Sequence, residues 1–278
     1  MKTLYIADLD GTLLDPSPAL TATSRDTLNA LSRRGLCFSA ATARTPATVD
    51  VLLSGLVTGA PCVVMNGACV YDLPSRRYIK AETFPIGSIL PVLRRFSLGG
   101  FAFSLQDGRL VTCYETVASD AARVYMEDRV RNFGKVFTQV SDLGAVQDAV
   151  YYSVTDRRER LVPAYAALKE TPGLRVEFYV DVYHPENYYL EVASAAASKA
   201  NAVQYVKKTC GFDRVVAFGD NYNDLPMFAV ADESCAMANA REEVRAAATR
   251  VIGANTEDGV ARYLESVFTD KEGASCRK

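Results

Sequence analysis

Runs of apolar residues alternate with amphipathic stretches over the first 70 residues of the chain. The amphipathic stretches are 21–35, which starts at Thr and Ser residues and closes on Gly35, and 45–56, which opens with Thr45 and Pro46. Both stretches carry the end signals of helices. The apolar runs are typical of strands covered on both faces, and they lie at 3–9, 36–42 and 61–67. Strand–helix alternation of this kind predicts a parallel sheet with right-handed crossovers.

The pattern changes between residues 86 and 185, where helical stretches mix with hairpin-like strands. Residues 101–115 predict a hairpin around Asp107 and Gly108. Helices are expected at 119–134 and 158–170, the second interrupted by Pro163, and strands at 149–155 and 174–182. This segment is predicted to be α+β.

From residue 189 onward the first pattern returns. Strands are expected at 214–220 and 233–238, and helices at 199–211, 224–230, 241–249 and 258–268. We therefore predict an α/β parallel-sheet core made of residues 1–83 and 189–278. An α+β domain, residues 84–188, is inserted into it.

Composition narrows the class of protein. The 278 residues carry a net charge of −2, so nothing favours nucleic acid or an anionic membrane as a partner. One histidine excludes a zinc site built on several histidines, and the seven cysteines contain no CxxC spacing. No apolar run is as long as a membrane span, and no signal peptide is visible. We expect a cytoplasmic protein that is a monomer or a weak homodimer.

Polar residues gather where predicted parallel strands end or the next helix begins. The four segments are "DLDGT" (8–12), "AATAR" (40–44), "SK" (198–199) and "FGDNYND" (218–224). Ligands of open α/β sheets bind at this edge, so the segments are expected to form one site. Oxygen ligands suit Mg²⁺, and they come from Asp8, Asp10, Asp220, Asn223 and Asp224. The Thr12 and Thr42 hydroxyls and the Lys199 charge would complete a site for a phosphoryl group.

Each segment alone also has a simpler interpretation. "DLDGT" could be a capped turn, Asp224 a helix N-cap, Lys199 a surface residue and Thr42 an ordinary strand residue. The four segments in this order at four strand ends favour the functional interpretation.

Five blocks of this sequence together resemble the haloacid dehalogenase superfamily, and within it the Cof-like phosphatases with a type IIB cap. The blocks are "DLDGTLL", "MNGACVYD", "GDNYNDLPMF", "AMANAREEVRAAAT" and "NTEDGVARYL". The resemblance spans the whole core. It implies a Rossmann-like core with a cap domain inserted after the third strand, in agreement with the domain pattern read from the sequence.

The resemblance also implies roles for individual residues. Asp8 would attack phosphorus and form an aspartyl phosphate. Asp10 would act as general acid and then as general base, and would lend its backbone carbonyl to the metal. Asp220 would bind Mg²⁺ with Asn223 and Asp224 beside it. The phosphate and substrate are expected to contact Leu9, Thr12, Thr42, Ala43, Arg44, Asn66, Lys199 and Asn223.

Two departures from the family pattern affect this site. Ala43 stands where the family usually has glycine, and its N–H can donate to phosphate if its φ is negative. The family's glycine shortly before the motif lysine is missing from "ASAAASK" (193–199).

The inserted domain carries five aromatic residues around the sole histidine, His184. They are Phe178, Tyr179, Tyr183, Tyr188 and Tyr189. They could form a substrate-facing surface, but strand preference and packing explain most of them. His184 is expected at the surface.

The favoured function is a Mg²⁺-dependent phosphomonoesterase that acts on small phosphorylated metabolites, such as sugar phosphates or pyridoxal phosphate. Alternatives are a phosphomutase of the same superfamily and a non-catalytic protein that binds phosphorylated metabolites. A binding protein would not need both Asp8 and Asp10.

Overall fold

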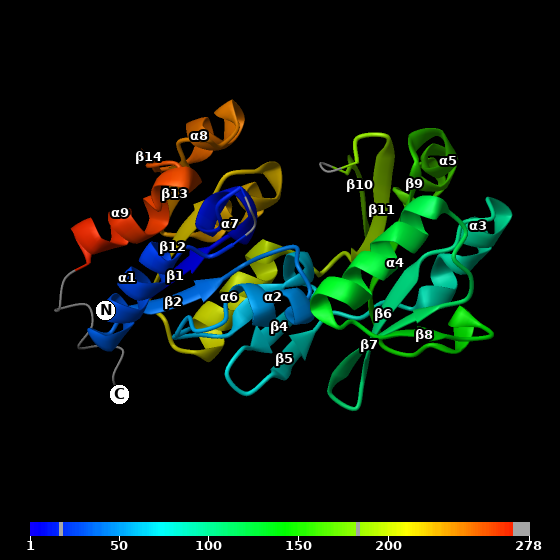
Figure 1. The fold of residues 1–278 in the computed structure, drawn as a ribbon, viewed down its shortest axis with the longest axis horizontal. Coiled ribbons are helices and arrows are strands. Elements are labelled where there is room, and N and C mark those ends of the chain that lie inside the picture. The colour runs from blue at the N-terminus through cyan, green and yellow to red at the C-terminus, as the bar shows by residue number, and fades with distance from the viewer. Residues whose placement is uncertain (17–18, 182–183, 269–278) are drawn as a thin grey trace. The chain divides into compact units, whose positions relative to one another are not determined.

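The computed structural model describes residues 1–16, 19–181 and 184–268 (Figure 1). The chain divides into two compact units, one made of Met1–Lys80 with Ser198–Lys278 and the other of Ala81–Ala197. No helix within the described ranges is long and apolar enough to cross a membrane.

The first unit is built on a five-stranded parallel sheet, which confirms the predicted α/β core. Its strand order is β14-β13-β12-β1-β2. Every residue of β1 is buried, as expected for a strand covered on both faces. The strands are β1 (Thr3–Ala7), β2 (Cys37–Ala40), β12 (Arg214–Gly219), β13 (Glu233–Met237) and β14 (Arg250–Ile252).

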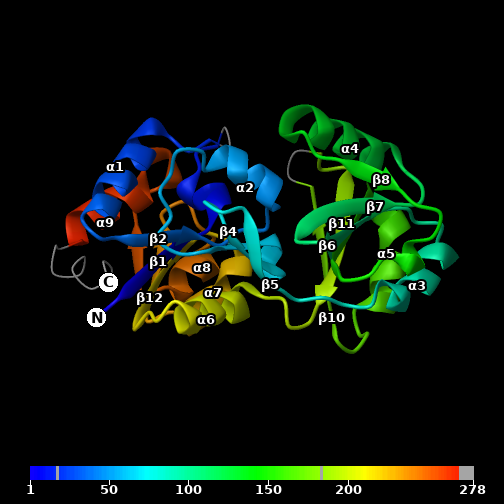
Figure 2. The same ribbon diagram turned by 90° about the horizontal axis from the view of Figure 1, so that it is seen from below.

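Helices cover both faces of this sheet. Figure 2 shows α1 and α9 on one side and α6 and α7 on the other. As predicted, α1 begins after Thr21, whose side chain accepts a hydrogen bond from the Ser24 N–H (3.0 Å). The helices are α1 (Ala22–Arg33), α2 (Pro46–Leu52), α6 (Lys199–Thr209), α7 (Leu225–Val230), α8 (Glu242–Ala247) and α9 (Gly259–Val267).

A small second sheet, with strand order β3-β4-β5, completes the first unit. Its strands are β3 (Cys62–Val64), β4 (Cys69–Asp72) and β5 (Arg77–Ala81). The predicted third strand corresponds to β3, which contacts the parallel sheet through the Ala41–Val63 bridge. The sequence analysis did not foresee β4 and β5.

The register of the parallel strands brings the ends of three strands together. Ala7 of β1 pairs with Ala40 of β2 on one side and with Phe218 of β12 on the other. The residues that follow these three positions therefore lie at the same edge of the sheet. Asp8 is one of them, and it lies between the loops that follow β2 and β12.

The second unit corresponds to the predicted α+β domain and contains a six-stranded sheet of order β10-β11-β9-β6-β7-β8. It extends to Ala197 rather than to the expected residue 188, because β11 pairs with β10 and β9. Pro163 lies inside α5 without ending it. The strands are β6 (Phe101–Gln106), β7 (Arg109–Tyr114), β8 (Phe137–Gln139), β9 (Ala149–Arg157), β10 (Leu174–Val180) and β11 (Asn187–Ser194). The helices are α3 (Leu90–Arg95), α4 (Asp120–Phe133) and α5 (Arg158–Leu168).

The two faces of this sheet differ in character. One face forms an apolar core with α3 and α5, in which Tyr152, Leu161 and Leu190 are buried. On the other face, Glu191 of β11 accepts a hydrogen bond from the Tyr151 hydroxyl of β9. Burial raises the pKa of Glu191 to about 7. This face therefore combines buried aromatic rings, Phe101 against Tyr125 and Phe103 against Tyr151, with a titratable carboxyl.

The five aromatic residues singled out in the inserted domain do not all share one environment. Phe178 stacks between Tyr165 and Tyr188, with ring centroids 5.1 Å apart in both pairs, which confirms the packing role for Phe178 and Tyr188. Tyr179 and Tyr189 pack on each other at 5.6 Å, and Tyr179 is 41% exposed. His184 is exposed, as expected, and Tyr183 lies outside the described residues.

Candidate active site

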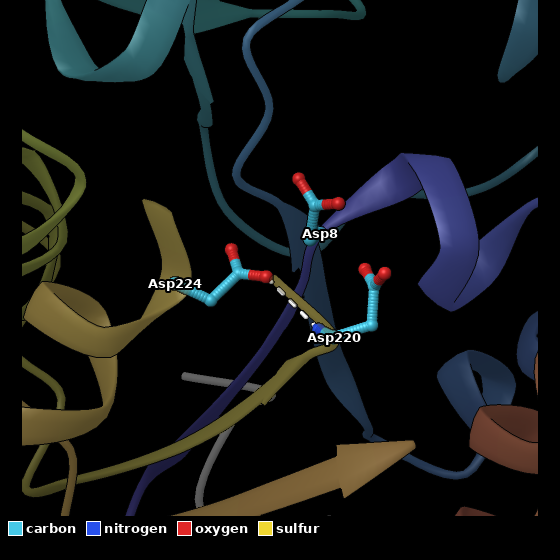
Figure 3. A group of neighbouring side chains, drawn as sticks. All are labelled: Asp8, Asp220 and Asp224. Carbon is cyan, nitrogen blue, oxygen red and sulfur yellow. Dashed lines mark hydrogen bonds between the residues drawn. The ribbon is translucent and has the colours of Figure 1, made fainter. Parts of the chain in front are cut away.

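Three carboxylates converge at the edge of the parallel sheet (Figure 3). We call Asp8, Asp220 and Asp224 the acidic trio, because one oxygen of each lies within 4.8 Å of the others. Asp8 follows β1, Asp220 follows β12, and Asp224 ends the short turn Tyr222–Asp224. Asp224 is fully buried and accepts hydrogen bonds from the N–H groups of Asp220 (3.0 Å) and Asn221 (3.1 Å). It therefore shapes the loop that carries Asp220.

Lys199 meets two members of the acidic trio. Its Nζ donates to Oδ1 of Asp8 (2.6 Å) and to Oδ1 of Asp224 (2.7 Å), and the residue is 2% exposed. Burial alone would lower the pKa of Lys199, but the two carboxylates outweigh it and raise that pKa. The interpretation of Lys199 as a surface residue is therefore wrong, and Asp224 does more than cap a helix.

One lysine does not balance three carboxylates, so the trio has two uncompensated negative charges when all three groups are ionised. Burial raises the pKa of Asp8 well above its usual range, and Lys199 offsets this only in part. Burial, followed by repulsion from Asp224 and Asp10, raises the pKa of Asp220 to about 6. A divalent cation bound by oxygen ligands would supply the missing charge, and this donor set fits Mg²⁺.

The turn after Asp8 depends on its glycine. Gly11 has φ +76°, and a Cβ at this position would lie 2.4 Å from Oδ2 of Asp220. The adjacent Thr12 hydroxyl donates to Oδ1 of Asp220 (2.8 Å). Gly11 and Thr12 therefore hold the turn in contact with the Asp220 side chain. The Leu9 side chain is fully buried, so Leu9 could reach a ligand only through its backbone.

Two asparagines that the sequence analysis did not single out support this turn. Asn239 donates from Nδ2 to the Gly11 carbonyl (2.8 Å), and Asn255 donates from Nδ2 to the Leu14 carbonyl (2.9 Å). Both lie within sequence blocks that carried the family resemblance, "AMANAREEVRAAAT" and "NTEDGVARYL". Membership of those blocks was the available signal.

Asp10 lies outside the acidic trio and has a different partner. Arg44 donates two hydrogen bonds to the Asp10 carboxylate, from Nε to Oδ2 (2.7 Å) and from Nη2 to Oδ1 (2.6 Å). The Asp10 side chain is 47% exposed, whereas Asp8 is buried. Two aspartates separated by a single residue therefore occupy distinct electrostatic environments.

Hydrogen bonds tie the loop after β2 to the loop after β3. The N–H of Thr42 donates to the Val63 carbonyl (2.9 Å), and the Thr42 carbonyl accepts from the Asn66 N–H (3.0 Å). Thr42 is fully buried. Ala43 is exposed and does not have a positive φ, so it meets the condition under which its N–H can donate to an anion.

Asn223 links the loop after β12 to the loop after β3. Its Nδ2 donates to Oδ1 of Asn66 (3.3 Å). Its Oδ1 is buried and accepts no hydrogen bond from any residue that the structure describes. Buried acceptors are seldom left unsatisfied, so this oxygen is suited to a cation or a ligand.

Gly67 compensates for the glycine missing before Lys199. It has φ +89°, and a Cβ there would lie 2.1 Å from the Ser198 carbonyl oxygen. The Ser198 hydroxyl caps α6 by accepting from the Asn201 N–H (3.0 Å). The "ASAAASK" loop is thus held by close contact with a glycine from another loop.

The chain is similar to known proteins along nearly its whole length. A family model described as haloacid dehalogenase-like hydrolase matches residues 5–264. The pyridoxal phosphate phosphatase YbhA of Escherichia coli (strain K12) is 27% identical over 279 residues, which cover 96% of this chain and 99% of the relative.

Solved structures share the fold. A haloacid dehalogenase-like hydrolase from Bacteroides thetaiotaomicron has a TM-score of 0.80 and 23% identity, covering 96% of this chain and 100% of that one. The subclass IIB sugar phosphatase BT4131 has a TM-score of 0.69 and 20% identity, covering 96% and 98%.

The matched range runs from β1 into α9 and includes every residue of the site. The resemblance read from the sequence blocks is confirmed, as is the α/β core with an inserted α+β domain. The chain belongs to the haloacid dehalogenase-like hydrolase family.

Proposed function

We propose that this protein is a Mg²⁺-dependent phosphomonoesterase that hydrolyses small phosphorylated metabolites through an aspartyl phosphate on Asp8. One observation carries the proposal: a single buried lysine joins Asp8 to Asp224, so three carboxylates converge with only one positive charge among them. A site of this charge suits a divalent cation and the phosphoryl group that accompanies it.

The metal would be held by Asp8, Asp220 and the backbone carbonyl of Asp10, with Asn223 and Asp224 beside it. Bound Mg²⁺ supplies the positive charge that lets an anionic nucleophile approach an anionic phosphate. Lys199, the Thr42 hydroxyl and backbone N–H groups at Leu9, Thr12 and Ala43 would bind the phosphate oxygens.

In the first half-reaction, a carboxylate oxygen of Asp8 forms a bond to phosphorus. The bond from phosphorus to the ester oxygen breaks, and its electron pair leaves with that oxygen. Asp10 gives its proton to the departing oxygen, so an alcohol and phospho-Asp8 are formed. Arg44 and Asn66 would lie near the alcohol part of the substrate.

In the second half-reaction, Asp10 takes a proton from water while the water oxygen forms a bond to phosphorus. The bond between phosphorus and Asp8 breaks, and inorganic phosphate leaves. Asp8 is a carboxylate again and Asp10 again carries a proton, so the enzyme returns to its starting state.

The substrate class follows from the relatives. One is named a pyridoxal phosphate phosphatase and another a sugar phosphatase. We propose substrates of this size, with the unit of Met1–Lys80 and Ser198–Lys278 as the catalytic core and the unit of Ala81–Ala197 as the cap that discriminates among them. Cytoplasmic location remains an expectation.

Phosphate release from a panel of phosphorylated metabolites tests the proposal. Pyridoxal phosphate and hexose phosphates should release phosphate with Mg²⁺ but not with EDTA, and Asp8→Asn should be inactive. Activity that required a bisphosphorylated sugar as activator would indicate the phosphomutase instead. Binding of these metabolites without release of phosphate would indicate the non-catalytic alternative.

A further inference from the structure

Arg44 and Asp10 form an ion pair that is separate from the acidic trio. Both carboxylate oxygens of Asp10 accept from the guanidinium, at 2.7 and 2.6 Å. The Arg44 side chain is 17% exposed and that of Asp10 is 47% exposed. A bidentate pair between arginine and a carboxylate adds geometric specificity as well as energy, so this pair can orient Asp10.

The backbone of Arg44 is held by hydrogen bonds on both sides of its Cα. The Arg44 N–H donates to the Thr42 hydroxyl (3.1 Å), and its carbonyl accepts from the Met65 N–H (3.1 Å). The guanidinium therefore projects from a fixed point on the loop after β2.

Asp10 depends on this arginine for its orientation. Within the described residues, Arg44 is the donor of the hydrogen bonds to the Asp10 carboxylate, and Asp10 is followed by Gly11 in a left-handed turn. A bidentate contact fixes the plane and direction of a carboxylate, whereas one hydrogen bond leaves it free to rotate.

We propose that Arg44 is a positioning residue for proton transfer by Asp10, beyond the substrate contact already assigned to it. Without Arg44, a half-exposed carboxylate would sample several rotamers and meet the departing oxygen less often. A misplacement of about 1 Å can cost about 10²-fold in rate. The inference rests on the proposed function, because it concerns the acid–base residue of that reaction.

Leaving groups of graded basicity separate positioning from substrate binding. p-Nitrophenolate departs with little protonation, whereas an alkoxide needs the proton of Asp10. We expect Arg44→Ala to lower kcat/KM for glycerol phosphate about tenfold more than for p-nitrophenyl phosphate. Arg44→Lys, which keeps one donor and the charge, should recover part of that difference.

A double-mutant cycle shows whether Arg44 acts through Asp10. In the Asp10→Asn background, Arg44→Ala should no longer change the ratio between the two substrates. Arg76→Ala is the matched control, because it removes an exposed arginine that pairs with Asp50 at 3.6 Å in the same unit. The control should leave the ratio at the wild-type value, and circular dichroism melting checks that every variant is folded.

Two results would overturn the inference. An equal loss on both substrates would mean that Arg44 binds the shared phosphate, and an unchanged effect of Arg44→Ala in Asp10→Asn would mean that it acts apart from Asp10. The proposed function fails differently: wild-type enzyme would then release no phosphate, or Asp8→Asn would release it at the wild-type rate.

Discussion

Removal of the Lys199 charge is the sharpest perturbation of the site. Lys199→Met keeps the aliphatic stem, which fits a side chain that is 1% exposed, but leaves Asp8 and Asp224 facing each other without a cation. Loss of one partner of a buried ion pair costs about 3–5 kcal/mol. We expect the free energy of unfolding of the metal-free protein to fall by about this amount.

The stability lost in Lys199→Met should also depend on pH. Burial already raises the pKa of Asp8, and loss of Lys199 raises it further. A carboxyl group whose pKa is raised by folding favours the folded state at low pH and opposes it once it ionises. The destabilisation should therefore be larger at pH 8 than at pH 5.

Urea unfolding in EDTA at both pH values measures these effects. Lys207→Met is the matched control, since Lys207 lies on the same helix and pairs with Asp232 at 2.9 Å on the surface. Its loss should cost at most about 1 kcal/mol. A Lys199→Met protein as stable as this control at pH 8 would refute the buried ion-pair network.

Three further predictions test other parts of the structure. Gly67→Ala should lower the urea midpoint more than Gly211→Ala, because both glycines have positive φ but only Gly67 has a neighbour against its missing Cβ. Glu191→Gln should raise the melting temperature at pH 8 and change it little at pH 4. Folding raises the pKa of Glu191 from 4.5 to about 7. Ionised Glu191 therefore destabilises the folded state by up to about 3 kcal/mol above pH 7. Mg²⁺ should raise the urea midpoint of the EDTA-treated protein, and Asp220→Asn should remove most of that gain. An equal gain in Asp220→Asn would argue against Asp220 as a ligand.

Periodicity and helix-end signals predicted the elements that are covered on both sides or capped. The buried run of β1 and the Thr21 cap of α1 are examples. The strand β5 was not predicted because Arg77–Ala81 is half exposed and lacks a continuous apolar run. The strand β4 is buried but spans only four residues. The edge strand β14 was not predicted either, because it has only three residues and two of them are exposed.

The candidate site was predictable as a set of residues but not as a set of contacts. Spacing along the chain placed Asp8 and Asp220 at strand ends and Lys199 at the start of a helix. The pairing of Arg44 with Asp10 joins residues 34 positions apart, and it depends on how β1 pairs with β2. The close contact between Gly67 and the Ser198 carbonyl likewise joins two loops that are distant in sequence. Neither contact therefore has a local sequence signal.

The separate duties of Asp8 and Asp10 are the central claim, and pre-steady-state kinetics of Asp10→Asn with p-nitrophenyl phosphate test it most directly. Asp10→Asn should release one equivalent of nitrophenol in a burst and then stall, because no base activates water. Intact mass should show one added phosphoryl group, and Asp8→Asn should show neither burst nor added mass. Turnover by Asp10→Asn at the wild-type steady-state rate, without a phosphorylated enzyme, would contradict the claim.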